Sequence, residues 1–156
     1  MPVLVLACIL AGCGGVGKSA WQRVAGDGVS FEAPVGWTVS AAAGAVTARS
    51  GPVDLVEVVR FRLERPYRRS RLAAAARELD SLAVRLARAL HGRLVHRQTT
   101  TVGGLDARSY RIDYPGKTQE ITFALRGLDE YELVCRRPAG ADDSACRRLL
   151  ASFRAG

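Results

Sequence analysis

The sequence predicts an α+β fold in which an antiparallel β-sheet is covered by one long and one short helix. A helical pattern runs from Ser70 to His91, between segments that alternate apolar and polar residues. Four strand-like segments then follow one another across glycine-containing turns, and a short helical segment comes last. Short glycine turns join neighbouring antiparallel strands, and strands grouped around two helices are typical of α+β domains.

The first half of the chain contributes the predicted strands before the long helix. Alternation of apolar and polar residues indicates each strand, and Pro34 and Pro66 end the first and the last of them. The strands are Val29–Glu32, continued past a turn by Val35–Val39, then Ala45–Arg49 and Val53–Leu63. In the last one, the apolar residues share one face and the arginines the other: Leu55, Val59, Phe61 and Leu63 against Arg60 and Arg62.

The predicted long helix begins at Ser70, because serine commonly caps a helix N-terminus, and Gly92 ends it. Its apolar positions recur at three- and four-residue spacing, which places them along one narrow stripe. They are Leu72, Ala76, Leu79, Ala83, Leu86 and Leu90. An alanine-rich stripe between strands favours packing on the sheet over binding to a membrane surface.

The second half predicts a meander of four strands and a closing helix. The strands are Leu94–Val102, Leu105–Tyr114, Thr118–Arg126 and Glu130–Arg136, and the helix covers about 142–153. Alternation places Ile121, Phe123 and Leu125 on one face of their strand, and Tyr131, Leu133 and Cys135 on one face of theirs. The helix is expected to turn Leu149, Leu150 and Phe153 inward, with Asp142 and Asp143 at its N-terminus.

Two incompatible motifs overlap near the N-terminus. The apolar run Val3–Leu10 leads into Leu10-Ala11-Gly12-Cys13, the pattern of a lipoprotein processing signal, in which Cys13 is acylated and the chain is cut before it. The run is too short to span a bilayer as a mature helix, although no Lys or Arg precedes it. We therefore expect a signal peptide at 1–12, a tether at 13–27 and one domain at 28–156.

The competing motif is Gly12–Ser19, which matches the phosphate-loop pattern G-x-x-x-x-G-K-[ST] and resembles the first motif of small Ras-like GTPases. Such a loop needs a following helix of several turns, but Gly26 and Gly28 interrupt the chain soon after Ser19. The sequence also lacks asparagine, so the base-reading Asn-Lys-x-Asp of that family is absent. The lipoprotein interpretation is the stronger one, and a cytosolic P-loop GTPase-like protein is the alternative.

The cysteines fit an exported protein. Cys8 would leave with the signal and Cys13 would carry the lipid, which leaves Cys135 and Cys146 as a pair. A bridge between them would persist only in an oxidising compartment. Two buried free thiols are the alternative, and metal ligation is disfavoured because no Cys or His lies at ligand spacing from either.

Composition indicates one globular domain of strongly basic character. The net charge is +8, with 48% hydrophobic and 24% charged residues. Of the 23 basic residues only Lys18 and Lys117 are lysines, which is as consistent with coding bias as with a selected surface. The functional interpretation of the charge is attraction to anionic lipid or anionic wall polymer. Nucleic acid is not an expected partner, because no basic run is interleaved with aromatic residues.

The densest basic patch is the best candidate for an anionic partner. It consists of Arg65, Tyr67, Arg68, Arg69 and Arg71. Motifs of hydrolases and metalloproteases are absent, and the only histidines, His91 and His96, are most simply surface residues. We therefore expect no catalytic residue, no metal ligand and no cofactor.

Three segments resemble the PsbP-like fold. They are Val29-Ser30-Phe31-Glu32-Ala33-Pro34-Val35-Gly36-Trp37, Val102-Gly103-Gly104-Leu105-Asp106-Ala107-Arg108 and Leu149-Leu150-Ala151-Ser152-Phe153. The resemblance covers roughly Gly28 to Arg154 and implies an antiparallel sheet between helices, as in photosystem extrinsic proteins, a Ran-binding import factor and many bacterial lipoproteins. It implies a noncatalytic binding or assembly domain, and no functional residue carries over from it.

Together these observations predict a lipoprotein on the outer face of the cytoplasmic membrane. It would be held by membrane lipid through acylated Cys13 and would bind an envelope protein or an anionic polymer. A secreted enzyme with a site assembled from scattered residues is a further alternative, which a deep pocket of convergent ionisable groups would favour.

Overall fold

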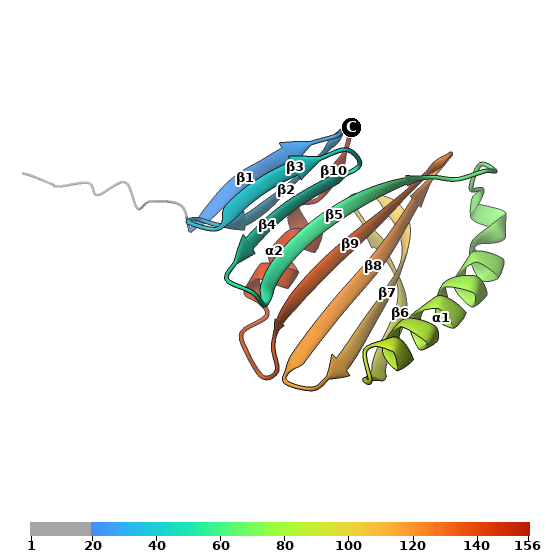
Figure 1. The fold of residues 1–156 in the computed structure, drawn as a ribbon. Helices are drawn as coiled ribbons and strands as arrows, with labels where there is room; N and C mark the ends of the chain where they lie inside the picture. The colour runs from blue at the N-terminus through green and yellow to red at the C-terminus, as the bar shows by residue number, and fades with distance from the viewer. Residues whose placement is uncertain (1–19) are drawn as a thin grey trace, which may run out of the picture.

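The computed structural model describes residues 20–156 as two antiparallel sheets and two helices, so the predicted α+β class is confirmed (Figure 1). The helices are α1 (Leu72–Ala89) and α2 (Ser144–Ser152), with a 3-10 turn η1 (Arg69–Arg71) before α1. The strands are β1 (Trp21–Gly26), β2 (Val29–Pro34), β3 (Thr38–Ala42), β4 (Ala45–Ser50), β5 (Asp54–Arg62), β6 (Arg93–Val102), β7 (Leu105–Tyr114), β8 (Lys117–Arg126), β9 (Asp129–Pro138) and β10 (Arg154–Ala155).

The larger sheet has seven strands in the order β3-β4-β5-β9-β8-β7-β6. The predicted meander forms β6 to β9, and its turns lie at the predicted glycines. Val102 pairs with Leu105 across Gly103 and Gly104, both of which have positive φ angles. Two consecutive residues of positive φ match the twist of a two-residue hairpin, which explains the glycine pair.

The smaller sheet, in the order β1-β2-β10, lies with α2 against one face of the larger sheet. Figure 1 shows α1 over the opposite face. The chain therefore has two cores. The first contains Phe31, Val56, Val58, Tyr131, Leu133, Leu149 and Phe153, and the second contains Leu79, Ala83, Ala87, Tyr110, Ile112, Ile121 and Phe123. Inward placement of the predicted faces of β8, β9 and α2 is confirmed.

The N-terminal boundary of the domain differs from the prediction. Residues 21–26, assigned to the tether 13–27, form β1 and pair with all of β2. Val24 is buried in the first core, and Asp27-Gly28 turns the chain with positive φ angles at both residues. An Asp-Gly pair is a hairpin signal, so the residues before it belong to a strand. The predicted signal peptide 1–12 and the tether up to Ser19 lie outside the described residues.

Two smaller predictions at element ends are also wrong. Thr38 begins β3, later than the predicted Val35, because the backbone N–H of Trp37 bonds to the carbonyl of Pro34 and turns the chain. Ser70 does not cap α1, because η1 precedes the helix and the N-cap residue is Arg71. The later part of the predicted stripe packs on the sheet through Leu79, Ala83, Leu86 and Leu90, joined by Ala87, which the prediction left out.

Candidate binding surface beside helix α1

The predicted basic patch lies in the connection between β5 and α1. Arg65, Arg68 and Arg71 are exposed there. Arg69 is exposed too, but its guanidinium lies 3.3 Å from a carboxylate oxygen of Asp106. The structure therefore leaves three of the four arginines free to meet a partner, and binding of an anionic group there stays a prediction.

Tyr67 anchors this connection to the sheet. Its hydroxyl donates a 2.9 Å hydrogen bond to Asp106, and its backbone N–H donates a 2.6 Å bond to the carbonyl of Gly127. Burial and the hydrogen bond to Asp106 raise the pKa of the Tyr67 hydroxyl to about 12. The side chain is thus a neutral hydrogen-bond donor that holds the segment in place, and the arginines around it remain the anion-binding candidates.

A groove of about 300 Å³ opens between this connection, the first turns of α1 and the sheet. We call it the α1 groove. Its lining combines apolar residues, which are Leu63, Pro66, Ala74, Ala75, Leu79 and Leu125, with charged ones, which are Arg65, Arg71, Glu78 and Glu130. No Ser, Thr, Cys or His side chain lines it. The α1 groove therefore offers apolar contact and ionic contact, but none of the usual nucleophiles or imidazole bases.

An ion-pair network fixes α1 to the sheet beyond the groove. Both carboxylate oxygens of Asp80 accept 3.0 Å hydrogen bonds from Arg108, and one accepts a 2.7 Å bond from the Tyr110 hydroxyl. Burial would raise the pKa of Asp80, but the bonds from Tyr110 and Arg108 outweigh it and the pKa is lowered. The position of α1 is thereby set over one half of the sheet.

The other half of the same sheet face has no helix over it. Helix α1 packs mainly on β6 and β7, and its core reaches Val134 of β9, whereas β4 and β5 continue beyond it (Figure 1). We call the α1-side surface of β4, β5 and β9 the open face. On it Phe61 is 45% exposed, and Leu55 and Val59 are half-buried. The sequence pattern correctly placed these three residues on one face, but the more buried face of β5 carries Val56 and Val58 instead.

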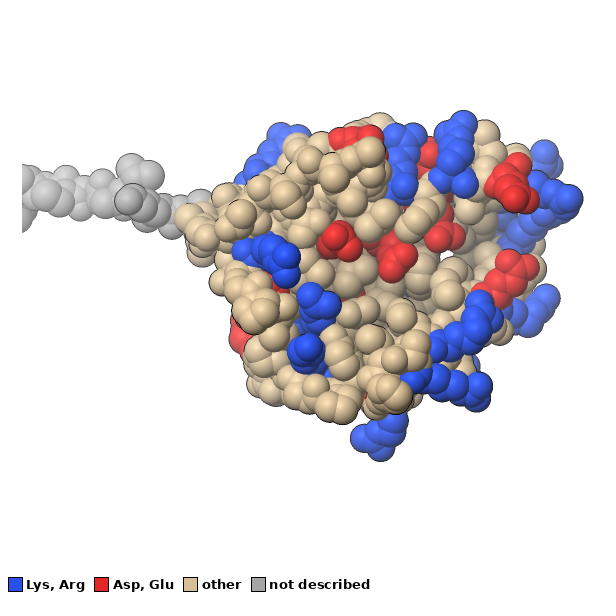
Figure 2. All heavy atoms as spheres, in the orientation of Figure 1, with Lys and Arg blue, Asp and Glu red and all other residues tan. Residues whose placement is uncertain are grey.

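Three glutamates lie among these apolar residues. In the strand register Glu132 is opposite Val59 and Glu130 is opposite Phe61. Glu57 lies on the same face of β5, two residues before Val59. We call Glu57, Glu132 and Glu130 the acidic row. Figure 2 shows acidic side chains gathered in the middle of this view, over β5 and β9, with basic side chains beside them on the left and others towards the margins.

The side chains of the acidic row are half-buried, yet none of them forms an ion pair with an arginine of residues 20–156. Glu32, Asp80, Asp106, Glu120 and Asp129 each pair with one or more arginines. Within the described chain, the side chains of Glu130 and Glu132 have neither a hydrogen bond nor an ion pair, and Glu57 accepts a bond only from Thr47. Burial raises the pKa of Glu130, and burial together with Glu130 and Glu57 raises that of Glu132.

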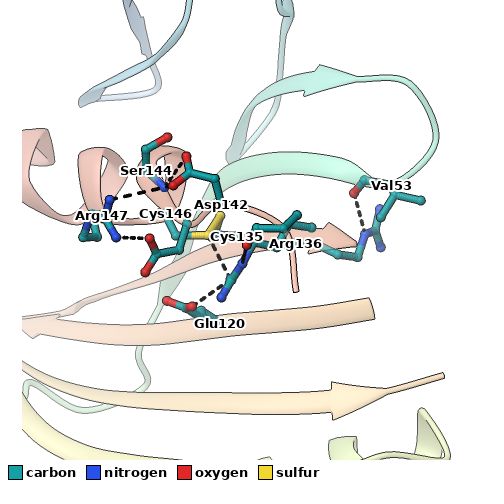
Figure 3. Close-up of a disulfide and its surroundings, with 11 residues drawn as sticks. Val53, Glu120, Cys135, Arg136, Asp142, Ser144, Cys146 and Arg147 are labelled. Carbon is teal, nitrogen blue, oxygen red and sulfur yellow. Dashed lines mark hydrogen bonds and ion pairs between the residues drawn. A yellow bond between two sulfur atoms is a disulfide. The ribbon is translucent and has the colours of Figure 1, made fainter. Parts of the chain in front are cut away.

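Cys135 and Cys146 join β9 to α2 on the other side of the sheet (Figure 3). Their sulfur atoms lie 2.07 Å apart, which is the length of a disulfide bond. Both residues are buried, and Arg137 pairs with Glu120 beside them at 2.7 Å. The predicted pairing is therefore present in the fold, whereas Cys13 lies outside the described residues.

Other chemistry is sparse in the part of the chain that the structure describes. No group of three His, Cys, Asp or Glu side chains there could hold a metal ion. No helix between residues 20 and 156 is long and apolar enough to cross a bilayer. The residues after the phosphate-loop motif form the strand β1, so the helix that such a loop requires is not formed by Trp21–Gly26.

No protein-family model matches the sequence, and no curated protein matches it either. Solved structures do match the fold. The cyanobacterial PsbP protein CyanoP from Synechocystis sp. PCC 6803 superposes with a TM-score of 0.64 at 14% identity, over 94% of this chain and 99% of that one. The fold is PsbP-like.

A second match has a different extent. A protein from Bacteroides thetaiotaomicron VPI-5482 superposes with a TM-score of 0.55 at 15% identity, over 83% of this chain and 45% of its own length. The chain therefore spans under half of that protein. At these identities the likeness concerns the PsbP-like fold alone, and the site has to be argued from the residues of this chain.

The sequence predicted the basic residues of the α1 groove but not the acidic row on the open face. The predicted patch included Arg65, Tyr67 and Arg71, which line the α1 groove. Alternation around Tyr131 indicates that Glu130 and Glu132 share a face. Pairing of β5 with β9, which brings Glu57 beside them, joins strands that are far apart in the sequence, and no local pattern predicts it.

Proposed function

We propose that the protein is an exported lipoprotein that acts as a noncatalytic binding or assembly module on the outer face of the cytoplasmic membrane. Acylation of Cys13 would supply the anchor, and the α1 groove with the open face would supply the binding surface. The observation that carries the binding role is the uncovered half of the sheet next to a groove lined in part by apolar residues. Surfaces of this kind are typical of protein interaction sites.

The compartment is inferred from the cysteines. A disulfide between Cys135 and Cys146 supports export, because such bonds are rare in the reducing cytosol. Leu10-Ala11-Gly12-Cys13 supports lipidation, and two acyl chains on one cysteine would anchor a protein stably where one chain is marginal. The PsbP-like fold and the lack of nucleophilic or imidazole side chains in the α1 groove support a noncatalytic role.

Fractionation of cells grown with an alkyne analogue of palmitate tests this proposal. The wild-type chain should incorporate the label and sediment with membranes, whereas Cys13→Ser should lose the label. Cys8→Ser is the matched control, because it removes a thiol from the segment that is cut away and should leave labelling unchanged. Equal labelling of wild type and Cys13→Ser, or a wild-type chain found only in the cytosol, would refute the proposal.

A further inference from the structure

The open face is wide enough to accept another segment of chain. Seven strands spaced about 4.8 Å apart span about 29 Å, whereas one helix is about 10 Å across. Helix α1 packs mainly on β6 and β7, and its core reaches Val134 of β9. The surface over β4, β5 and Glu132 of β9 has no described helix packed on it. The α1 groove adjoins this surface, since Glu130 belongs to both.

Acidic and apolar side chains alternate across this surface. Val59 lies opposite Ala45 on one side and Glu132 on the other, and Glu132 lies opposite Phe123 in turn. Two residues further along the strands, Phe61 lies opposite Glu130, which lies opposite Leu125. Glu130 and Glu132 therefore each have apolar neighbours on both adjacent strands. A partner that matched the pattern would carry basic and apolar groups at similar intervals.

The charge of the surface opposes that of the whole molecule. The chain has a net charge of +8, yet Glu130 and Glu132 have no arginine partner among residues 20–156. Arg49 and Arg136 share the face, on either side of Leu55, but neither forms an ion pair with the acidic row. Arg136 turns to the carbonyl of Val53, to which its Nε donates a 3.1 Å bond. Arg65 and Arg71 line the α1 groove together with Glu130, but neither forms an ion pair with it. Among residues 20–156 the acidic row therefore has no ion pair with an arginine, although basic side chains lie on the same face (Figure 2).

We propose that the open face docks a segment of another protein in which lysine or arginine side chains are interleaved with apolar ones. This inference rests on the proposed binding function and names the chemistry of its partner. The basic groups would pair with the acidic row, while the apolar groups would cover Val59 and Phe61. An anionic polymer is disfavoured on this surface, because it would bring like charges against Glu57, Glu130 and Glu132.

Fluorescence anisotropy with synthetic peptides tests this inference. The protein is the full chain carrying Cys13→Ser, so the result does not depend on lipidation. The probe is a fluorescein-labelled peptide of about ten alternating lysine and leucine residues, long enough to cross the face at about 3.3 Å per residue. Two comparison peptides replace all lysines by glutamate or all leucines by serine. We expect the lysine–leucine peptide to bind best and the glutamate–leucine peptide not to bind.

The matched variants locate the binding. The combined variant Glu57→Gln, Glu130→Gln, Glu132→Gln keeps the shape of the side chains and removes three charges, and it should weaken binding about tenfold. The combined variant Asp27→Asn, Asp54→Asn, Asp142→Asn removes three charges away from the open face and should leave affinity unchanged. Thermal melts of both variants establish that they are folded.

Several outcomes would overturn the inference. Equal binding of the lysine–leucine and glutamate–leucine peptides would exclude charge complementarity, and equal binding of the lysine–serine peptide would exclude the apolar contribution. Unchanged affinity of the glutamine variant would place the site elsewhere. Concentration-dependent dimerisation that the glutamine variant abolishes would make a second copy of this chain the occupant. None of these results would bear on labelling at Cys13, so the two proposals fail separately.

Discussion

Acidic side chains have pKa values shifted in opposite directions in this molecule because their neighbours differ. Burial would raise the pKa of Asp129, but hydrogen bonds from Arg60 and Arg62 outweigh it and lower the pKa. Glu132 is half-buried beside Glu130 and Glu57 with no cation, so its pKa is raised. Asp129 therefore stabilises the folded state when it is charged, whereas Glu132 destabilises it.

Replacing Glu132 by glutamine should stabilise the protein at neutral pH, by up to about 1 kcal/mol. Above a raised folded-state pKa the carboxylate costs stability, and this cost disappears as the pH falls through that pKa. The gain from Glu132→Gln should therefore shrink between about pH 7 and about pH 4.5. Urea unfolding of wild type and Glu132→Gln at both pH values checks this, with Asp27→Asn as the control. A loss of stability at pH 7 would show that Glu132 has a stabilising partner.

Asp80→Asn should have the opposite effect and lower the free energy of unfolding by about 1.5–3 kcal/mol, because it weakens charge-assisted bonds to Arg108 and leaves that guanidinium poorly compensated. The pKa of Asp80 is lowered in the folded state, so its contribution is present above the ordinary aspartate pKa and is lost as the pH falls through the lowered value. Chemical unfolding at neutral pH measures it. A variant as stable as wild type would mean that the network does not hold α1.

The alternation of residues predicted which side chains share a face of a strand, but not which element packs on that face. Alternation correctly grouped Leu55, Val59 and Phe61, yet their face is the open one. The deciding fact is that α1 lies over β6 and β7, and neither composition nor spacing contains that information. The acidic row was missed for the same reason.

Among the elements, α1 ends at Ala89, two residues before the predicted His91, and Gly92 is not the residue that ends it. The backbone N–H of His91 bonds to Arg88 O and that of Gly92 to Ala87 O, which together make a Schellman motif. The left-handed position of this motif is held by His91, with φ 53°, and not by Gly92. Gly92 is needed for another reason, because a Cβ there would lie 2.6 Å from the carbonyl oxygen of Asp113.

Substitutions at these two adjacent positions should act in opposite directions. His91→Gly relieves a non-glycine residue of a positive φ and should stabilise the protein by up to about 1 kcal/mol. Gly92→Ala should destabilise it by about 1–3 kcal/mol, because backbone of β7 must move to admit the new Cβ. Urea unfolding of the pair measures both effects, and each variant serves as the control for the other. Destabilisation by both would indicate that His91 makes a specific contact.

The disulfide ties α2 to β9, and its removal should loosen that helix. The double variant Cys135→Ser, Cys146→Ser opens a loop closed by residues 11 apart and should lose about 2–3 kcal/mol of stability. Cys13→Ser should cost nothing in the same assay, because that thiol takes no part in the bridge. Thermal melts with and without dithiothreitol check the result: wild type should fall to the level of the double variant, which itself should not respond. A wild-type melting temperature unaffected by reductant, with both thiols shown to be free, would contradict this account.

Most strands were predicted from the sequence, but β1 and β10 were not. Most strands and both helices lie where alternation or helical spacing placed them, because each buries one face that the pattern records. The strand β1 was missed because Trp21–Gly26 lies next to the N-terminal motif, and its single buried residue, Val24, produces little alternation. The two-residue strand β10 depends on pairing with β2 and is too short to have a pattern.

In the whole molecule, a compartment, an anchor and a binding surface depend on different parts of the chain. The Cys135–Cys146 bond favours an oxidising environment, and the motif ending at Cys13 favours attachment to lipid. Sequence alone could predict both, since the first depends on counting cysteines and the second on a short local pattern. The binding surface required the fold, because it combines β5, β9 and the first turns of α1.

The mass of the intact protein purified from cell membranes shows whether the chain is cut before Cys13 and acylated there. We predict a chain that begins at Cys13, carries acyl groups on that residue and has Cys135 joined to Cys146. A chain that still includes residues 1–12, carries no acyl group and has both C-terminal thiols free would contradict it.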